Sequence, residues 1–380
     1  MKKNSQITAI GKYAMNLIET YFDENKPHRV FLVRGKHSFI SSGAEYILSD
    51  LFRRYACFVS EFSDFQENPI LEEVNNGCNF FEKSKSDIII ACGGGSVLDM
   101  AKLIRFKAAY DGDLVDSVFE KKKELTPLIA LPTTAGTGCE ATPFAVCYKN
   151  SIKYSVAHND MLPDYAVIFP QFTYNNSSYL TACTGFDALS QSIEAYWNVN
   201  ATAESDEYAK RAISVLWDNL PKVVNSPSNE IRDLMSVAAY WSGCAIAITK
   251  TTAPHAFSYA FTTHCGYPHG HAVALSFPFF MALNLLEKQD FAFQPRINID
   301  EYYKKTAWLQ SQLGFSDEIN IQSEMQSYLN NIGLCNNGYG DNDLTIMLNQ
   351  VNIQRLVNNP VIVTKDIIER DFIHQLINQR

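Results

Sequence analysis

Two histidines and one aspartate are the residues of this chain whose types best suit metal chemistry. His255 and His269 stand fourteen positions apart, and Asp187 lies upstream in the segment 184–194. Two imidazoles and one carboxylate form a donor set that suits a divalent first-row metal such as Fe(II). Gln191 follows Asp187 by four positions, so on a helix the two side chains share one face. The spacing predicts a metal centre built from three separate segments.

A run of three glycines, Gly93, Gly94 and Gly95, follows an apolar strand and opens a helix. Glycines at such a turn let the backbone bend sharply and approach a ligand closely. Ser96 is expected to cap the helix, with Asp99 three residues later as its capping partner. Because the free amides of a helix start attract phosphate, we predict a nucleotide site here. The alternative is a tight turn closed by a capping box.

A second loop with the same character spans residues 132–138. It also leaves the end of a strand, and it carries Thr133, Thr134 and Thr137 besides two glycines. In an open parallel sheet, ligands bind in the crevice beyond the carboxyl ends of the strands. Two such loops favour a pyrophosphate cradle over two unrelated turns. A metal and a nucleotide together indicate the reduction of a carbonyl group, or its reverse.

The first strand ends in a basic turn made by Arg34, Gly35 and Lys36. A carboxylate at this place would bind a ribose 2′-hydroxyl group and repel a 2′-phosphate. Gly35 removes that repulsion, and its two neighbours add positive charge. We therefore predict that Gly35 contacts the cofactor and that NADPH is accepted. A basic surface turn without a ligand is the alternative.

Composition and length indicate a globular protein of two domains. The 380 residues are 46% hydrophobic and 19% charged, and the net charge of −9 argues against a general binder of nucleic acid or of anionic membranes. The first residues lack the apolar segment of a signal peptide, and no apolar run reaches the roughly 20 residues of a membrane span. Nine scattered cysteines without a C-x-x-C pair indicate reduced thiols, so we expect a cytoplasmic protein.

The two halves of the chain differ in hydrophobic periodicity. The first half alternates predicted strands at 29–33, 57–62, 87–91, 128–131 and 164–169 with predicted helices at 42–55, 71–85 and 97–110, and it adds a hairpin at 143–148 and 152–156. This alternation predicts an α/β domain with a parallel sheet. Later residues show helical periodicity at 178–197, 205–224, 230–247, 253–262, 270–286, 300–313, 318–332 and 364–377. We predict a dinucleotide-binding domain over 1–174 and a helical metal- and substrate-binding domain over 175–380.

Taken together, these motifs resemble the iron-containing, or group III, alcohol dehydrogenase family. The matching segments are 93–99, 132–142, 184–189 and the stretch from His255 to His269 that ends in Pro-His-Gly. The resemblance implies an N-terminal Rossmann-like parallel-sheet domain, a C-terminal helical domain, and hydride transfer between NAD(P)H and an alcohol or aldehyde. It also implies a divalent metal, Fe(II) or Zn(II), and a homodimer or larger homo-oligomer.

The resemblance also assigns roles to individual residues. It implies cofactor contacts at Gly93, Gly94, Gly95, Ser96, Asp99, Thr133, Thr134, Thr137, Thr142 and Lys153, and metal ligands at Asp187, Gln191, His255 and His269. The chain departs from the family at Gln191, where histidine is usual and an amide oxygen is a weaker donor. It departs again at Tyr259, where many members have histidine.

We expect metal-assisted hydride transfer, in which the metal polarises the aldehyde carbonyl and stabilises the alkoxide that develops. The cofactor supplies the hydride, and the protein supplies position and charge. Water, Tyr259 or His271 is expected to deliver the proton.

The segment that precedes His255 bears on the substrate. Lys250, Thr251 and Thr252 offer an ammonium group and two hydroxyls at a helix start, which predicts an anion site. The texture of these motifs is similar to the phosphonoacetaldehyde reductase branch, which reduces phosphonoacetaldehyde to 2-hydroxyethylphosphonate. Arg355 is a second, weaker candidate for an anion contact, and a surface arginine is the favoured alternative. A broad alcohol or polyol dehydrogenase, a lyase like dehydroquinate synthase and a non-catalytic nucleotide-binding protein remain as alternatives.

Overall fold

The computed structural model describes residues 6–114, 118–150, 152–285, 292–315, 320–335, 351 and 356–372. Its backbone contacts divide the chain into two compact units. The first unit comprises residues 1–176 and 228–243, and the second comprises 177–227 and 244–380. No helix in the described segments is long and apolar enough to cross a membrane.

The first unit is built around a six-stranded parallel sheet with the strand order β1-β10-β7-β4-β2-β3. The strands are β1 (Ile7–Ile10), β2 (Arg29–Arg34), β3 (Phe58–Phe62), β4 (Ile88–Gly93), β7 (Leu128–Pro132) and β10 (Tyr165–Ile168). The helices are α1 (Asn16–Asn25), α2 (Ser38–Ser41), α3 (Ala44–Arg54), α4 (Leu71–Ser84) and α5 (Gly95–Ala109). Two antiparallel pairs lie outside the sheet, β5 (Tyr110–Asp111) with β6 (Glu120–Lys121) and β8 (Phe144–Lys149) with β9 (Ile152–Ala157).

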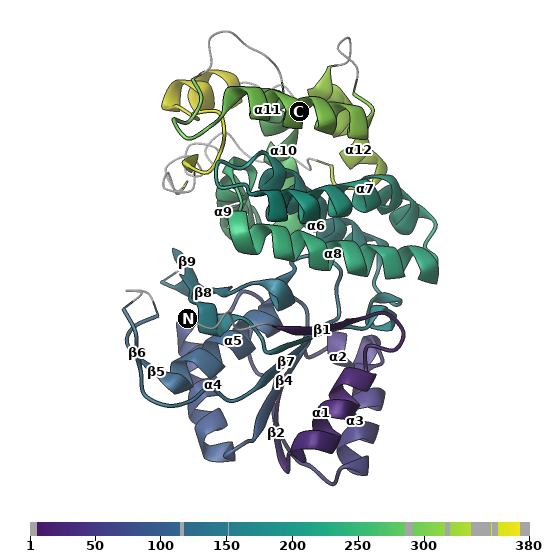
Figure 1. The fold of residues 1–380 in the computed structure, drawn as a ribbon, viewed down its shortest axis with the longest axis vertical. Coiled ribbons are helices and arrows are strands. Elements are labelled where there is room, and N and C mark those ends of the chain that lie inside the picture. Colours follow the sequence, from purple (N-terminus) through teal and green to yellow (C-terminus); the bar gives the residue numbers. More distant parts are fainter. Residues whose placement is uncertain are drawn as a thin grey trace. The chain divides into compact units, whose positions relative to one another are not determined.

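Both faces of this sheet are covered by helices. In β2, Phe31 and Val33 pack into the core formed with α4 and α5, whereas Val30 and Leu32 pack into the core formed with α1 and α3. Figure 1 shows these two helix pairs on opposite sides of the strands. A strand that is buried on both faces is apolar at every position, which explains why the central strands read as unbroken hydrophobic runs. The predicted Rossmann-like parallel sheet is confirmed.

The strand register brings three loop starts to one edge of the sheet. Arg34 at the end of β2 is paired with Cys92, and Gly93 at the end of β4 is paired with Pro132 at the end of β7. The amide of Gly35 donates to the Cys92 carbonyl at 3.3 Å. The basic turn, the glycine turn and the threonine loop therefore begin side by side.

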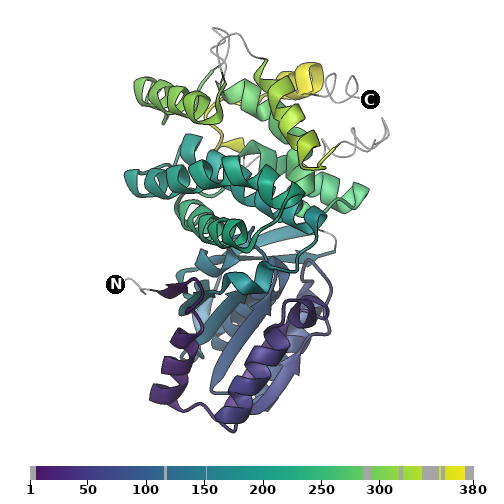
Figure 2. The same ribbon diagram turned by 90° about the vertical axis from the view of Figure 1, so that its right-hand side faces the viewer.

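The second unit is helical, as the periodicity predicted. Its helices are α6 (Ser178–Trp197), α7 (Ala203–Asn225), the C-terminal end of α8 (Asn229–Thr249), α9 (Ala253–Cys265), α10 (His269–Leu285), α11 (Ile299–Leu313) and α12 (Ile321–Asn331), with a π-helical turn at Ile367–Phe372. From Thr181 to Trp197 every residue of α6 except Thr184 is buried, polar side chains included. Figure 2 shows the helices of this unit, coloured from teal to yellow, stacked against one another. Buried polar residues on a central helix need partners, and they locate the site described below.

The N-terminal part of α8 groups with the first unit, although we expected all residues after 174 to belong to the second. The Arg232 guanidinium donates to the carbonyls of Thr173 and Asn176, both at 2.9 Å. The Tyr240 hydroxyl lies 2.8 Å from the hydroxyl of Thr8 in β1. These bonds attach residues 228–243 to the sheet unit, and the helix then continues into the second unit at Cys244.

Candidate metal centre and nucleotide turn

The glycine turn joins β4 to α5 at the carboxyl edge of the sheet. A Cβ atom on Gly93 would lie 2.5 Å from Val97 Cγ2, and one on Gly95 would lie 2.8 Å from Thr137 Cγ2, so packing requires glycine at both positions. Gly94 differs, because a Cβ there would meet its nearest neighbour, Thr134, at 3.7 Å, which is ordinary contact. The fold therefore leaves room beside Gly94, next to the first amides of α5, which have no partner within the helix.

Ser96 and Asp99 do not form the capping box that we predicted. The helix begins at Gly95, with Gly94 as the N-cap residue and no side-chain cap. Ser96 consequently lies inside the first turn, where its Oγ accepts a hydrogen bond from the Asn68 amide at 3.1 Å. The missing side-chain cap leaves the helix start to its backbone amides, as a phosphate-binding turn requires.

Asp99 belongs to a buried polar cluster beside the turn. Its Oδ2 accepts from the Val146 amide at 2.9 Å, and its Oδ1 lies 3.9 Å from Lys102 Nζ. Burial raises the pKa of Asp99, against the opposing charges of Lys102 and Lys153. Lys102 Nζ also donates to the carbonyl and hydroxyl oxygens of Thr142 at 3.0 and 3.1 Å. Thr142 is fully buried and accepts both bonds from Lys102, and its predicted contact with a cofactor stays a prediction.

The threonine loop carries an unsatisfied hydroxyl group. Thr133 is 1% exposed, and its Oγ1 has no hydrogen-bond partner in the described part of the chain. Thr137 Oγ1, by contrast, accepts from the Cys139 amide at 3.3 Å. A buried hydroxyl without a partner costs free energy unless water or a ligand satisfies it. Its position beside the glycine turn fits a nucleotide.

The basic turn after β2 is neutralised by carboxylates that follow β3. Arg34 Nε lies 2.7 Å from Glu61 Oε2, and Lys36 Nζ lies 3.0 Å from Asp64 Oδ1. Gly35 is packed tightly between them, since a Cβ there would lie 2.1 Å from Ser38 Oγ. Ion pairs as exposed as these contribute at most ~1 kcal/mol, so an incoming phosphate can compete for the two cations.

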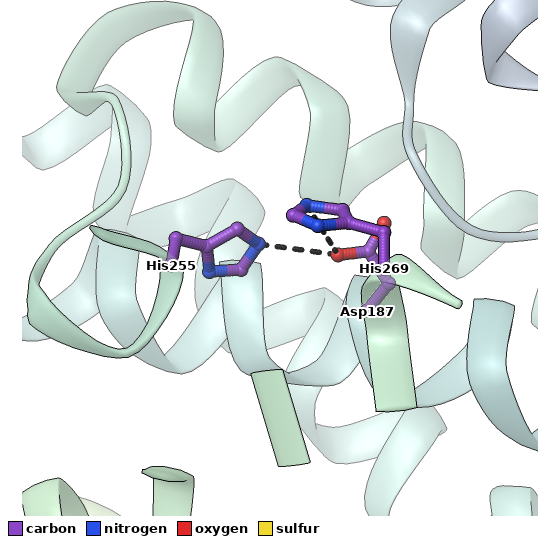
Figure 3. A group of neighbouring side chains, drawn as sticks. All are labelled: Asp187, His255 and His269. Carbon is purple, nitrogen blue, oxygen red and sulfur yellow. Dashed lines mark hydrogen bonds and ion pairs between the residues drawn. The ribbon is translucent and has the colours of Figure 1, made fainter. Parts of the chain in front are cut away.

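Asp187 of α6, His255 of α9 and His269 of α10 form one cluster (Figure 3). One donor atom from each lies within 4.8 Å of the other two. Asp187 Oδ1 is 3.1 Å from His255 Nε2 and 3.8 Å from His269 Nε2. The side chains of Asp187 and His255 are 3% exposed and that of His269 is 31% exposed, so the cluster opens on the His269 side.

Small residues let α10 approach α6 at this cluster. A Cβ on Gly270 would lie 1.9 Å from the Cys183 carbonyl oxygen and 3.2 Å from Asp187 Cβ.

Ser258 donates its hydroxyl hydrogen to the His255 carbonyl at 2.8 Å and lies 3.5 Å from His269 Nδ1. Both imidazoles therefore have Nδ1 next to protein oxygen and Nε2 towards Asp187.

Glu194 is the functional residue that sequence reasoning missed. It is fully buried on α6; its Oε1 contacts His255 Nδ1, and its Oε2 accepts from the amide and hydroxyl of Thr252 at 2.6 and 2.9 Å. Trp197 Nε1 donates to the Thr252 hydroxyl at 3.1 Å. The signal was available, since Glu194 follows Asp187 by seven positions and so lies on the same face of the helix.

The electrostatics of the cluster are compatible with a bound cation. Burial alone lowers the pKa of His255, but the carboxylates of Glu194 and Asp187 outweigh it and raise that pKa to about 9. Two buried carboxylates are costly without positive charge nearby. A divalent cation with neutral histidines balances both charges, so the residues present fit a divalent metal ion.

Gln191 lies one helical turn after Asp187 on α6 and is 4% exposed. Its amide is therefore on the face of α6 that carries the cluster. An amide oxygen is a ligand that hard cations accept, though a weaker one for zinc or iron than imidazole. Its placement is compatible with the predicted ligand role.

The two proton donors that we predicted differ in their surroundings. The Tyr259 ring is half-buried and lies parallel to the His269 ring, with 6.0 Å between the centroids. His271 is 1% exposed, with Nε2 at 2.9 Å from the Cys335 carbonyl and Nδ1 at 2.9 Å from the Tyr179 hydroxyl. Burial lowers the pKa of His271. Both ring nitrogens of His271 are engaged with protein groups in this structure, and its role as a proton donor stays a prediction.

The predicted anion site is only partly available. Thr252 gives its amide and its hydroxyl to Glu194, so a protein carboxylate already occupies the anion position at the start of α9. Thr251 is half-buried, and Lys250 is exposed in a left-handed conformation with φ of 63°. Arg355 lies outside the described residues. Of the predicted set, Lys250 and Thr251 remain candidates for substrate contacts.

Comparisons with known families agree with this arrangement. The family profile described as iron-containing alcohol dehydrogenase matches residues 5–170, and the profile for the C-terminal part of the Fe-containing alcohol dehydrogenase family matches residues 181–328. Long-chain-alcohol dehydrogenase 1 of Geobacillus thermodenitrificans is 35% identical over 231 residues, which are 59% of this chain and 58% of that protein. The NAD-dependent methanol dehydrogenase of Bacillus methanolicus is 29% identical over 288 residues, or 74% of this chain and 75% of that protein.

The match to the first of these relatives thus spans less than two thirds of its length. Solved structures are matched over almost the whole chain. The sulfoacetaldehyde reductase of Bifidobacterium kashiwanohense, solved in complex with NAD+, has a TM-score of 0.82 and 28% identity, with 98% of this chain and 96% of that chain covered. These matches favour a dehydrogenase over the lyase alternative.

Proposed function

The chain belongs to the iron-containing alcohol dehydrogenase family, and we propose that it interconverts a small aldehyde and its alcohol by hydride transfer with NAD(P)H. The buried cluster of Asp187, His255 and His269 carries this proposal. A purely structural cluster would have no need for an imidazole that keeps a third of its side chain open. The glycine turn supports it, because Gly94 has no packing reason to be glycine.

The nucleotide would bind at the carboxyl edge of the sheet. We assign its phosphates to the turn of Gly93, Gly94 and Gly95, with the unsatisfied hydroxyl of Thr133 as a further contact. The ammonium group of Lys153 lies close enough to Asp99 to lower its pKa, which supports a role beside the cofactor. Because the ion pairs of Arg34 and Lys36 are open to solvent on at least one side, a 2′-phosphate could compete for them, and we propose that NADPH is accepted as well as NADH.

Asp187, His255 and His269, with Gln191 beside them, would hold the metal. Fe(II) or Zn(II) bound there supplies the Lewis acidity that polarises a carbonyl oxygen. A bound NAD(P)H would supply the hydride for the carbonyl carbon, and the carbonyl oxygen would need a proton to complete the alcohol. The half-buried Tyr259 hydroxyl is our candidate for that proton, since its ring lies parallel to His269 at the open side of the cluster.

For the substrate we propose a small anionic aldehyde, with phosphonoacetaldehyde as the first candidate and 2-hydroxyethylphosphonate as its product. Lys250 supports an anion contact, because this exposed cationic residue lies between the end of α8 and the start of α9, five positions before His255. The matched sulfoacetaldehyde reductase is named for an aldehyde of the same charge class.

One assay tests the proposal. NADH and NADPH oxidation is followed with phosphonoacetaldehyde, succinic semialdehyde and butanal, each with and without added Fe(II) or Zn(II). We expect metal-dependent turnover and a higher kcat/KM for the charged aldehydes.

Variants of Lys250 test the anion contact. K250A should raise the KM for phosphonoacetaldehyde and leave the KM for butanal unchanged, and K250R should keep the higher kcat/KM for the charged aldehydes. Equal kcat/KM for butanal and phosphonoacetaldehyde would contradict the anionic substrate, and activity that survives chelation would contradict the metal.

A broad alcohol dehydrogenase is the second candidate. It is favoured by the position of Glu194, which removes Thr252 from any anion site, and by the long-chain-alcohol and methanol dehydrogenases among the relatives. It predicts that plain alcohols are turned over and that K250A is tolerated with every substrate.

A further inference from the structure

Glu194 is a buried carboxylate with both oxygen atoms engaged, and it contacts one of the proposed metal ligands. We infer that Glu194 is a positioning residue that fixes the ring and the tautomer of His255, so that Nε2 is ready for a divalent cation. The inference rests on the metal site in the proposed function. It assigns a role to a side chain that is not itself a ligand.

The contact with Glu194 determines which nitrogen of His255 keeps its hydrogen when a metal ion binds. A carboxylate is acceptor-only, so the contact between Glu194 Oε1 and His255 Nδ1 requires the hydrogen on Nδ1. By the same rule Nε2, which lies 3.1 Å from Asp187 Oδ1, also carries hydrogen in this structure (Figure 3). Binding of a metal ion would displace that hydrogen, and the contact with Glu194 would keep the one on Nδ1, so the lone pair would be on Nε2. A histidine ligand whose other nitrogen donates to a carboxylate is both oriented and made more basic.

The second oxygen of Glu194 positions the backbone that carries this histidine. Oε2 accepts from the amide and hydroxyl of Thr252, the residue that precedes α9, and His255 is the third residue of that helix. Ring and helix start are therefore fixed by the same group. Glu194 and Asp187 are both on α6, seven positions apart. Glu194 therefore also fixes the His255 ring and the start of α9 relative to Asp187.

Replacing Glu194 with glutamine disturbs this arrangement in a specific way. The single amide oxygen of E194Q can accept from Thr252 or from His255 Nδ1, but the amide NH₂ must then face the other group. Two donors from Thr252 favour the oxygen on that side, which leaves the NH₂ next to His255 Nδ1. The ring then has to move its hydrogen to Nε2, which is the wrong tautomer for binding a metal. Loss of such an outer partner lowers metal affinity by ~10–100-fold.

The experiment measures metal binding in the full-length protein without turnover. Wild type, E194Q, E194D and H255A are stripped with a chelator, and Zn(II) affinity is measured by competition with a chromophoric chelator. Co(II) is titrated in parallel, and its visible absorption reports the coordination geometry. W197F is the matched control, since it removes a hydrogen bond to Thr252 from the same buried network but leaves the contact between Glu194 and His255.

We expect E194Q to weaken Zn(II) binding ~10–100-fold and to change the Co(II) spectrum, and W197F to do neither. E194D keeps the carboxylate but is one methylene shorter, so an intermediate affinity supports the inference, and it serves in place of E194Q if that variant does not fold. Wild-type affinity and spectrum in a folded Glu194 variant would overturn it, as would equal losses in W197F. If wild type itself binds neither ion, the metal in the proposed function fails instead.

Discussion

At Gln191 the chain presents a neutral amide where a histidine would complete a stronger donor set. The residue is buried one turn after Asp187, so a substitution there changes the donor and not the location. We expect Q191H to tighten Zn(II) binding by at least ~10-fold, because imidazole is a better zinc ligand than an amide oxygen. Changes to groups that only support a ligand already alter metal affinity by about this factor. Chelator competition measures the change, with S190A, a buried hydroxyl on the adjacent α6 position, as the control. Unchanged affinity in Q191H would show that residue 191 lies outside the coordination sphere.

Glu140 makes a pH-dependent contribution in the first unit. Burial raises its pKa from 4.5 to about 7, against the hydrogen bond from its own backbone and the charge of Lys102. Between these pH values the folded chain binds a proton that the unfolded chain has lost. The contribution to stability is therefore fully present below pH 4.5, and it is lost as the pH rises through 7.

Urea denaturation at pH 5 to 8 measures this effect. The raised pKa corresponds to a loss of up to ~3 kcal/mol in the free energy of unfolding across that range. E140Q should flatten this dependence and be the more stable protein at pH 8. A wild-type profile that rises from pH 5 to pH 8, with E140Q parallel to it, would contradict the assignment.

The residues of the site divide into those that sequence predicts and those that need geometry. Asp187, His255 and His269 are predictable because few residue types bind transition metals and each lies in a recognisable motif. Glu194 was not predicted, and Thr252 was assigned to the substrate. The sequence shows that Thr252 offers a hydroxyl and a free amide at a helix start, but it does not show whether the acceptor is a substrate or a buried carboxylate on another helix. That partner is 58 positions away in the chain.

At the scale of elements, the glycines of the β4–α5 turn have two different reasons to be glycine. One is needed for packing, and the other leaves space for a ligand. Gly95 must be glycine to pass Thr137, whereas Gly94 has an ordinary φ of −75° and space for a Cβ. We expect G94A to keep the thermal midpoint of wild type but to lose at least ~10-fold in NADH affinity, because the methyl group enters the space that a phosphate would use. G95A should instead lower the midpoint.

Fluorescence titration with NADH and thermal unfolding monitored by circular dichroism measure the two effects. An unchanged NADH affinity in G94A would move the phosphates away from this turn. A wild-type thermal midpoint in G95A would mean that the Thr137 side chain can move aside and that packing does not require glycine at position 95.

Elements were predicted well where a long periodic run decides them. The central strands and α6 follow their hydrophobic pattern, and most bounds agree within a few residues. Besides the short elements α2, β5 and β6, we did not predict β1 and α1. β1 is a four-residue edge strand with partly exposed side chains, and its pairing with β10 joins residues far apart in the chain. The predicted helix at 364–377 is described only to residue 372, where its backbone is π-helical.

The chain has two units, and each contains the residues proposed to bind a different ligand. Every residue of the metal cluster belongs to the second unit, and the glycine turn and the threonine loop belong to the first. Segmentation of this kind is hard to read from sequence, because α8 looks like one uninterrupted helix while Arg232 and Tyr240 attach its first part to the sheet unit.

Ligand binding should therefore protect different parts of the molecule from hydrogen exchange. A ligand at 100 times its Kd stabilises the unit that holds it by ~2.7 kcal/mol, which slows exchange through unfolding of that unit about 100-fold. Zn(II) should slow exchange in peptides of α6, α9 and the start of α10, and NADH should slow it in peptides of β4 and α5. The division of α8 provides an internal control, since peptides from 229–243 should respond to NADH and those from 244–249 to Zn(II). The H255A variant should lose the Zn(II) response and retain the NADH response. If Zn(II) protects 229–243 as strongly as α6, the two units unfold together and the division has no energetic meaning.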